Sequence, residues 1–467
     1  MEKAARPILF VSSPEPGLIN PILVLAGELV RRSVPDVWIA TDENRRDDIE
    51  AMGVSFASLG EVIPELSAVT WDDKVYRAVY SETSRFRSHR AMITTGYVPR
   101  LTAAKYRQLE AVVDKVRPAV MVIDSEARYA FNLAIARQIP YVVSAPFEMS
   151  NLLCAYAPFS KTYTPRSFPT PHTGLPYKMN LVQQASNRLF RLRTLAMFIA
   201  PELSKTLREE IAINKELGVT QPGTMTKVEK AELVFCWNVR EFEYPLNPPD
   251  NVRTLGAALP PLPQAPDDEI IGWLDARPSV VYISFGTVTR LTRAEVASLA
   301  EVAGRLDGAH DVLWKLPADQ QQLLPPAESL PGNLRIENWV TSQYDVFAHP
   351  HVTAFLTHAG GNGFHEALSF GKPMVSRPLH GDCFDVAVRA KDRGVGLTLD
   401  PVKTVDPAHV TKLINRVLNE PSFRERAKHF AALEWAAGGR EKAADLLLGL
   451  PALAGDREPA GDRGPCR

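Results

Sequence analysis

Residues 339–383 read WVTSQYDVFAHPHVTAFLTHAGGNGFHEALSFGKPMVSRPLHGDC and combine an apolar strand, a glycine-rich turn and a helix. The run from Val352 to Thr357 predicts the strand, and His358 opens the turn that follows it. A turn of this kind before a helix leaves backbone N–H groups unpaired and directed at one point, which suits a phosphate. The helix dipole adds about half a positive charge at the same end. The stretch therefore predicts a diphosphate site made of backbone amides and an imidazole.

The rest of the chain alternates short apolar runs with helical stretches. The strands are predicted at residues 7–12, 37–41, 119–124, 141–144, 280–284, 311–315 and 334–338. This alternation predicts two doubly wound α/β domains, with ligands in a cleft at the carboxyl ends of the strands. Asn20 and Pro21 suit the cap and first position of the first helix.

Proline and helical patterns divide the chain. We expect an N-terminal domain over residues 1–240, a proline-rich linker over 241–266, a C-terminal domain over 267–425, helices over 426–450, and a disordered tail over 451–467. The helical stretch at residues 178–217 is rich in apolar and basic residues. It fits either a covering helix over the first domain or a surface that helps to admit an apolar or membrane-borne acceptor.

Composition excludes several classes of protein. The 467 residues include 53 basic and 54 acidic ones, so no electrostatic footprint for nucleic acid is present. No run has the length of a membrane span, the apolar run near the N-terminus is far shorter than a signal-peptide core, and the four cysteines are scattered. We expect a cytoplasmic monomer or homodimer without stable membrane insertion.

The same stretch resembles a known family. The order Trp339, Gln343, His358, Gly360, Asn362, Glu366, Gly371, Pro373 and Asp382 is similar to the donor signature of family 1 glycosyltransferases, the UDP-glycosyltransferase-like enzymes. The resemblance implies the GT-B fold, in which two Rossmann-like domains face a central cleft. The first domain would bind the acceptor and the second a nucleotide sugar, and the helices over 426–450 would pack back on the first domain. It implies no cofactor, and no metal is expected because no Asp-x-Asp cluster lies by the phosphate loop.

The resemblance also implies roles for single residues. Trp339, followed by Val340, would stack on the base, and Gln343 and Glu366 would contact the ribose. His358, Gly360, Asn362 and Gly363 would hold the diphosphate together with Gly286 and Thr287, and Asp382 and Cys383 would face the sugar. Relatives carry glutamine at the position of Cys383, and a thiol is a weak hydrogen-bonding group, so the donor sugar stays open between a glucose, an N-acetylated sugar and a deoxysugar.

One expected group is missing from the first loop. Relatives carry a catalytic histidine there in a Gly-His-x-x-Pro setting, whereas this chain has Gly17 and Leu18 at the acceptor-side loop. Three explanations stay open. A carboxylate replaces the base, with Asp124 ahead of Glu15; or the acceptor is acidic enough to need no base; or the chain is a catalytically silent auxiliary protein.

The sequence as a whole predicts an inverting, metal-independent glycosyl transfer from a UDP- or dTDP-sugar to a hydroxyl of a small molecule. The silent auxiliary protein is the alternative, and a nucleotide-sugar epimerase on the same fold is a third possibility.

Overall fold

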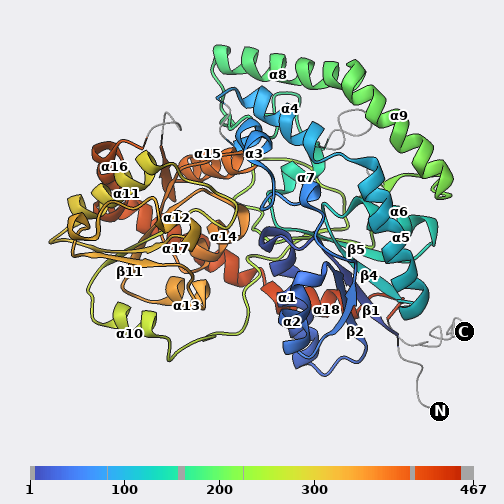
Figure 1. The fold of residues 1–467 in the computed structure, drawn as a ribbon, viewed down its shortest axis with the longest axis horizontal. Coiled ribbons are helices and arrows are strands. Elements are labelled where there is room, and N and C mark those ends of the chain that lie inside the picture. Colours follow the sequence, from blue (N-terminus) through green and yellow to red (C-terminus); the bar gives the residue numbers. More distant parts are fainter. Residues whose placement is uncertain (1–5, 81–82, 156–162, 224–225, 400–404, 454–467) are drawn as a thin grey trace, which may run out of the picture.

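The computed structural model describes residues 6–80, 83–155, 163–223, 226–399 and 405–453. They form two α/β domains, each built on one parallel sheet with helices on both faces (Figure 1). The two doubly wound domains predicted from the sequence are therefore confirmed. Most of the predicted tail (454–467) lies outside the described residues.

The first sheet has seven strands in the order β3-β2-β1-β4-β5-β6-β7, and every pairing is parallel. Its strands are β1 (Ile8–Val11), β2 (Val37–Thr41), β3 (Ser55–Ser58), β4 (Val120–Asp124), β5 (Tyr141–Ala145), β6 (Leu233–Cys236) and β7 (Val252–Thr254). The strands β1, β4 and β5 are buried throughout, because helices cover both faces of the sheet. The order reverses between β1 and β4, so loops that leave these two strands diverge and open a crevice.

The second sheet has six parallel strands in the order β10-β9-β8-β11-β12-β13. They are β8 (Val280–Ser284), β9 (Asp311–Lys315), β10 (Leu334–Glu337), β11 (Val352–Thr357), β12 (Met374–Ser376) and β13 (Gly396–Thr398). Here the order reverses between β8 and β11, where Thr357 lies opposite Ser284. The loops after both strands therefore begin side by side at a second switch point.

The helices surround the two sheets. In the first half they are α1 (Pro16–Arg31), α2 (Arg46–Ala51), α3 (Asp73–Tyr80), α4 (Arg85–Thr95), α5 (Pro99–Val116), α6 (Arg128–Ala136), α7 (Met149–Ala155), α8 (Leu181–Ile199) and α9 (Pro201–Glu216). In the second half they are α10 (Glu269–Asp275), α11 (Arg293–Leu306), α12 (Ala318–Gln321), α13 (Gln343–Ala348), α14 (Gly361–Ser369), α15 (Cys383–Arg393), α16 (Pro407–Asn419), α17 (Pro421–Ala436) and α18 (Gly439–Leu448). Within the described residues, no helix is both long enough and apolar enough to cross a bilayer.

Helix α1 begins earlier than the sequence analysis expected. Pro16 occupies its first turn and Glu15 is the N-cap, so the predicted start at Asn20 and Pro21 is wrong. A proline at the first helical position needs no N–H partner, which makes Pro16 the better start. Gly17 and Leu18 therefore belong to the first turn of a helix and not to a loop.

Two parts of the predicted division differ from the observed elements. The segment 241–266, expected as a linker, contributes β7, which pairs with β6 at the edge of the first sheet. Helix α17 spans the expected boundary at residue 426 and packs against α14 in the second domain. Only α18 returns to the first domain, where Ala443, Ala444 and Leu447 join the core beneath α1.

Buried polar contacts hold the two domains together at α15. Arg389 donates to Glu243 Oε1 from Nε at 2.9 Å and from a terminal nitrogen at 2.7 Å, and it also donates to Ser150 Oγ at 2.9 Å. Asp385, on the same helix, accepts from Asn151 Nδ2 at 2.9 Å and from the backbone N–H of His172 at 2.6 Å. Since these partners belong to the first domain, α15 is fixed across the domain boundary.

A second buried contact crosses the boundary at α14. The His365 imidazole lies between Glu148 of the first domain (3.0 Å) and Glu434 on α17 (2.7 Å). Burial alone would lower the pKa of this histidine, but the two carboxylates outweigh it and raise the pKa to about 10. His365 is therefore a structural cation, a role that the sequence alone did not assign.

Candidate active site

A cleft of about 290 Å³ lies between the two switch points. The first domain contributes the start of α1, the end of α3 and the segment after β5, and the second contributes the segments after β8 and β11 and the start of α15. Its lining includes Pro16, Gly17, Leu18, Asn20, Tyr80, Pro146, Phe147, Ser284, Gly286, Thr287, Val288, Thr289, Lys315, Gln343, Phe355, Thr357, His358, Gly360, Gly361, Asn362, Gly363, Glu366, His380, Asp382 and Cys383. Residues distant in sequence thus form one concave site, as expected for a small-molecule ligand.

The His358 imidazole lies in a cradle of two glycines. A Cβ atom on Gly286 would lie 2.7 Å from His358 Cε1, and one on Gly360 would lie 2.4 Å from His358 Nε2. Gly286 also has φ +75°, a conformation that other residues rarely adopt. Both positions therefore need glycine to admit the ring.

One ring nitrogen of this imidazole has no hydrogen-bond partner among the described residues. It is His358 Nδ1, which is buried. Burial, with a smaller contribution from Lys315, lowers the pKa of His358 to about 4, so the ring is neutral near pH 7. A neutral imidazole has one N–H to donate, and an unpaired buried polar group costs stability unless a ligand meets it.

The start of α14 adds backbone donors beside His358. Its N-cap is Gly360, which has no side chain to accept from the first-turn amides. These amides stay available for an anion, and the helix dipole favours one. The helix also approaches the first domain closely, since a Cβ on Gly361 would lie 2.4 Å from the Pro146 carbonyl oxygen.

Asn362 contacts the first domain in this structure. Its Nδ2 donates to the Gly17 carbonyl oxygen at 3.0 Å. That carbonyl is available because Pro21, four residues further along α1, has no N–H to donate to it. The predicted phosphate ligand therefore bridges the two switch points at the edge of the cleft.

The two predicted ribose contacts are bonded to each other. Gln343 Nε2 donates to Glu366 Oε2 at 2.9 Å, and Gln343 Oε1 accepts from the Tyr282 hydroxyl at 3.1 Å. Burial raises the pKa of Glu366 to about 7, although Gln343 and Lys315 oppose that shift. The glutamine thus orients the carboxyl group at the cleft wall.

Trp339 lies at the surface and is not among the described residues that line the cleft, although its neighbour Lys315 is. Its side chain is 58% exposed, and the Lys315 ammonium is 4.6 Å from the ring centroid. An exposed indole held by a cation is free to stack on a base. Val340, in contrast, is buried in the core of the second domain, so its side chain does not face the cleft.

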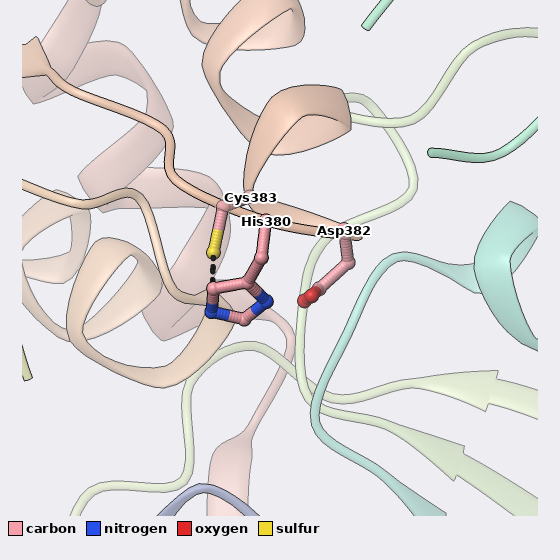
Figure 2. Close-up of side chains that lie close together, drawn as sticks. All are labelled: His380, Asp382 and Cys383. Atoms are coloured by element: carbon pink, nitrogen blue, oxygen red, sulfur yellow. Dashed lines mark hydrogen bonds between the residues drawn. The ribbon is translucent and has the colours of Figure 1, made fainter. Parts of the chain in front are cut away.

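The opposite end of the cleft holds the start of α15. Figure 2 shows the His380 ring between the Cys383 thiol and the Asp382 carboxyl group, with Cys383 Sγ 3.6 Å from His380 Nε2. One ligand atom from each of the three residues lies within 4.8 Å of the others. Histidine, cysteine and aspartate are ligand types that transition metals accept. The sequence analysis expected no metal and gave His380 no role, so this juxtaposition was missed.

Burial sets the protonation of this cluster. It raises the pKa of Asp382 to about 7, with a further contribution from Asp385, and it raises the pKa of the Cys383 thiol. It lowers the pKa of His380 to about 3. Near pH 7 the cluster therefore offers a neutral imidazole, a neutral thiol and a carboxyl group that exchanges protons readily.

The two carboxylates expected to replace the missing base differ in position. Asp124 is fully buried and accepts three backbone N–H bonds, from Ser13, Glu126 and Ala127, at 2.6–3.0 Å. It is not among the described residues that line the cleft. The structure thus gives Asp124 a role in holding the loops after β1 and β4, and it does not support ranking Asp124 first.

Glu15 does not line the cleft either, but it adjoins the cleft wall in the chain. It directly precedes Pro16, Gly17 and Leu18, which line the cleft, and its Oε1 is buried without a hydrogen-bond partner among the described residues. Burial raises the pKa of Glu15 to about 7. Its charge also acts on Tyr80, which lines the cleft.

Sequence reasoning missed Lys315 and Tyr80 as well. Lys315 ends a buried strand, and a charged residue at the end of such a strand is unusual enough to have indicated a functional role. Tyr80 lies 4.2 Å from His380, centroid to centroid. Its short helix gave no comparable signal.

Comparison with known proteins now adds to this geometry. The sequence profile of the family described as "UDP-glucoronosyl and UDP-glucosyl transferase" matches residues 36–435. This chain belongs to that family. It is 26% identical over 407 residues to UDP-glucuronosyltransferase 2A3 of Mus musculus, which covers 85% of this chain and 69% of the relative. The match to UDP-glucuronosyltransferase 2C1 of Oryctolagus cuniculus is 29% identical over 62% of this chain, but it spans only about half (55%) of that relative.

Solved glycosyltransferases share the whole fold. The glycotransferase of kitacinnamycin superposes with a TM-score of 0.68 at 20% identity, over 95% of this chain and 99% of that one. The UDP-glucose: anthocyanidin 3-O-glucosyltransferase, solved in complex with UDP, superposes with a TM-score of 0.64 at 17% identity, over 96% and 98%. The predicted GT-B fold and the resemblance to UDP-glycosyltransferases are thereby confirmed.

Proposed function

We propose that this UDP-glycosyltransferase family member transfers a sugar from a UDP- or dTDP-sugar to a hydroxyl group of a small molecule, with inversion at the anomeric carbon. The observation that carries the proposal is the glycine-cradled His358 beside the uncapped start of α14. Together they offer an N–H donor and backbone amides at one point of the cleft. Charge that develops on a leaving diphosphate is stabilised there by groups that are already in place.

The other residues of the cleft fit the two ends of such a donor. We propose that Trp339 stacks on the base while the Gln343–Glu366 pair meets the ribose hydroxyls. Gly286, Thr287 and Gly363 contribute close backbone approach to the phosphates. Asp382 and Cys383 lie beyond the diphosphate, where the sugar would be bound.

Replacing His358 by alanine tests this proposal. The variant is expected to lose about 10²–10³ in kcat/KM, the usual cost of removing one placed donor to a developing anion. Calorimetry would show weaker binding of UDP or dTDP, whereas binding of the free nucleoside would change little, since the imidazole faces the phosphates.

His429→Ala is the matched control. This histidine is exposed on α17 and is not among the described residues that line the cleft. It is expected to behave like the parent protein. Equal diphosphate affinity in His358→Ala and His429→Ala would overturn the proposed donor site.

The identity of the sugar depends on Cys383. Relatives carry glutamine at this position, and its amide both donates and accepts hydrogen bonds where a thiol does so weakly. Cys383→Gln is therefore expected to tighten binding of a UDP-hexose up to about tenfold, the value of one added hydrogen bond. Titration of the donor into Cys383→Gln and Cys383→Ala checks this; weaker binding to the glutamine variant than to the alanine variant would contradict it.

Donor consumption separates this function from the alternatives. A transferase consumes donor only when an acceptor is present, an epimerase converts it without one, and a silent auxiliary protein binds it unchanged. The cleft geometry favours transfer, because Tyr80 of the first domain lies against His380, at the Asp382–Cys383 end of the cleft. The cytoplasmic location and the monomeric or homodimeric state stay predictions from the sequence.

A further inference from the structure

The outer face of α8 is apolar. Ten large hydrophobic side chains are exposed among the described residues, and six of them lie on this one helix. They are Leu181 (82% exposed), Val182 (78%), Leu189 (47%), Leu192 (63%), Leu195 (38%) and Ile199 (83%). A contiguous exposed apolar patch on a protein surface marks an interaction site.

Helical spacing gathers these side chains on one stripe. Leu181, Leu192 and Ile199 are separated by 11 and 7 residues, close to whole numbers of turns, and the other three flank them. The opposite face is buried against the first domain through Phe190 and Met197. A surface helix ordinarily directs its polar face outward, so α8 is reversed relative to that pattern.

The charge of α8 indicates what covers this stripe. The helix contains Arg188, Arg191 and Arg193 and no acidic residue. Arg188 is exposed within the stripe, since it lies seven residues after Leu181 and seven before Leu195, and Arg193 is exposed at its edge. Arg191 donates to the Thr170 hydroxyl and to a backbone carbonyl beneath the helix. A second copy of the chain would bring the same arginines together across a twofold axis, which is unfavourable. An anionic surface complements them.

We propose that the outer face of α8 docks on an anionic lipid bilayer, with the apolar stripe in the boundary between headgroups and acyl chains. A helix of this composition lies in the plane of the interface, and binding combines buried apolar area with attraction to anionic headgroups.

The position of α8 links this surface to the cleft. Figure 1 shows α8 along the upper edge of the first domain, over α4 and α3. Ser88 on α4 donates to the Val79 carbonyl oxygen on α3 at 2.6 Å, and the next residue, Tyr80, lines the cleft. A bilayer bound to α8 would therefore lie on the acceptor side of the molecule.

Vesicle flotation of the full chain tests the proposal. The protein is expected to float with vesicles that contain phosphatidylglycerol, to bind pure phosphatidylcholine weakly, and to dissociate from the anionic vesicles at high salt. The double variant Leu192→Glu/Ile199→Glu is expected to lower the fraction bound at least about tenfold, because it places charge in the apolar stripe. Ile211→Glu, an equally drastic change at a 67% exposed position on α9, is the matched control and should bind like the parent.

Two results would overturn it. One is equal flotation of the parent and of Leu192→Glu/Ile199→Glu. The other is a parent dimer in analytical ultracentrifugation that the double variant dissociates, which would assign the stripe to a second copy. Arg188→Glu/Arg193→Glu provides an independent variant that keeps the stripe and should lose binding to anionic vesicles only. An unchanged melting temperature and unchanged UDP binding in each variant show that the fold and the donor site are intact.

Discussion

Replacing Glu15 by glutamine is expected to lower turnover at saturating donor by about 10²–10⁴, the usual contribution of a placed general base. Glu15 is the carboxylate nearest in sequence to Leu18, where the family resemblance implies a histidine, and its Oε1 is buried without a hydrogen-bond partner among the described residues. A base accepts a proton only when it is ionised. With the pKa of Glu15 raised to about 7 by burial, kcat/KM of the parent protein should rise with pH through about 7 and then level off.

Three observations check this prediction together. Glu15→Gln should remove the rise with pH, while UDP affinity by calorimetry stays the same, because the residue does not belong to the donor site. Asp124→Asn serves as the comparison and should act mainly on stability, since the carboxylate of Asp124 accepts backbone N–H groups. If Asp124→Asn abolished turnover with an unchanged melting temperature while Glu15→Gln did not, Asp124 would be the base after all.

Replacing Arg389 by methionine is expected to destabilise the protein by about 3–5 kcal/mol, because it leaves a buried carboxylate without its cation. Arg389 and Glu243 are both buried, and the pair joins α15 to the first domain. The same helix begins with Cys383 and follows Asp382, so its displacement would also disturb the sugar end of the cleft. Thermal and urea unfolding measure the loss, and donor affinity measures the displacement.

The double variant Arg389→Met/Glu243→Gln should recover part of this loss, since no unpaired charge stays buried. Arg416→Met is the matched control. It breaks an exposed pair with Glu420 on α16, and such pairs contribute little. An Arg389→Met protein as stable as Arg416→Met would show that the buried pair does not hold the domains together.

Much of the fold was accessible from local sequence. The strands at residues 280–284, 311–315 and 352–357 have the predicted bounds, because each is a short apolar run with clear ends. The start of α1 was not accessible in this way. Two prolines, Pro16 and Pro21, both suit a first helical position, and only packing selects between them.

The candidate site likewise has one part that local sequence predicted and one part that depends on distant segments. His358, Gly360 and Glu366 lie within nine residues, and the structure places them together on the cleft wall, where Gly286 from a distant segment joins them. The ranking of Asp124 over Glu15 rested on family resemblance, and it could not include the backbone N–H groups that occupy the Asp124 carboxylate. His380 received no role because its neighbour Tyr80 is 300 positions away in the chain.

The sequence by itself determined two parallel α/β domains and a phosphate-binding turn after one strand, since both depend on residues close together in the chain. Only the tertiary structure decided what crosses the domain boundary: the Asn362 bond to Gly17, the Arg389 pair with Glu243, and the cluster of His380 with Tyr80. The reason is physical. Hydrogen bonds and burial between distant segments depend on how two sheets face each other, and no local pattern of residues encodes that arrangement.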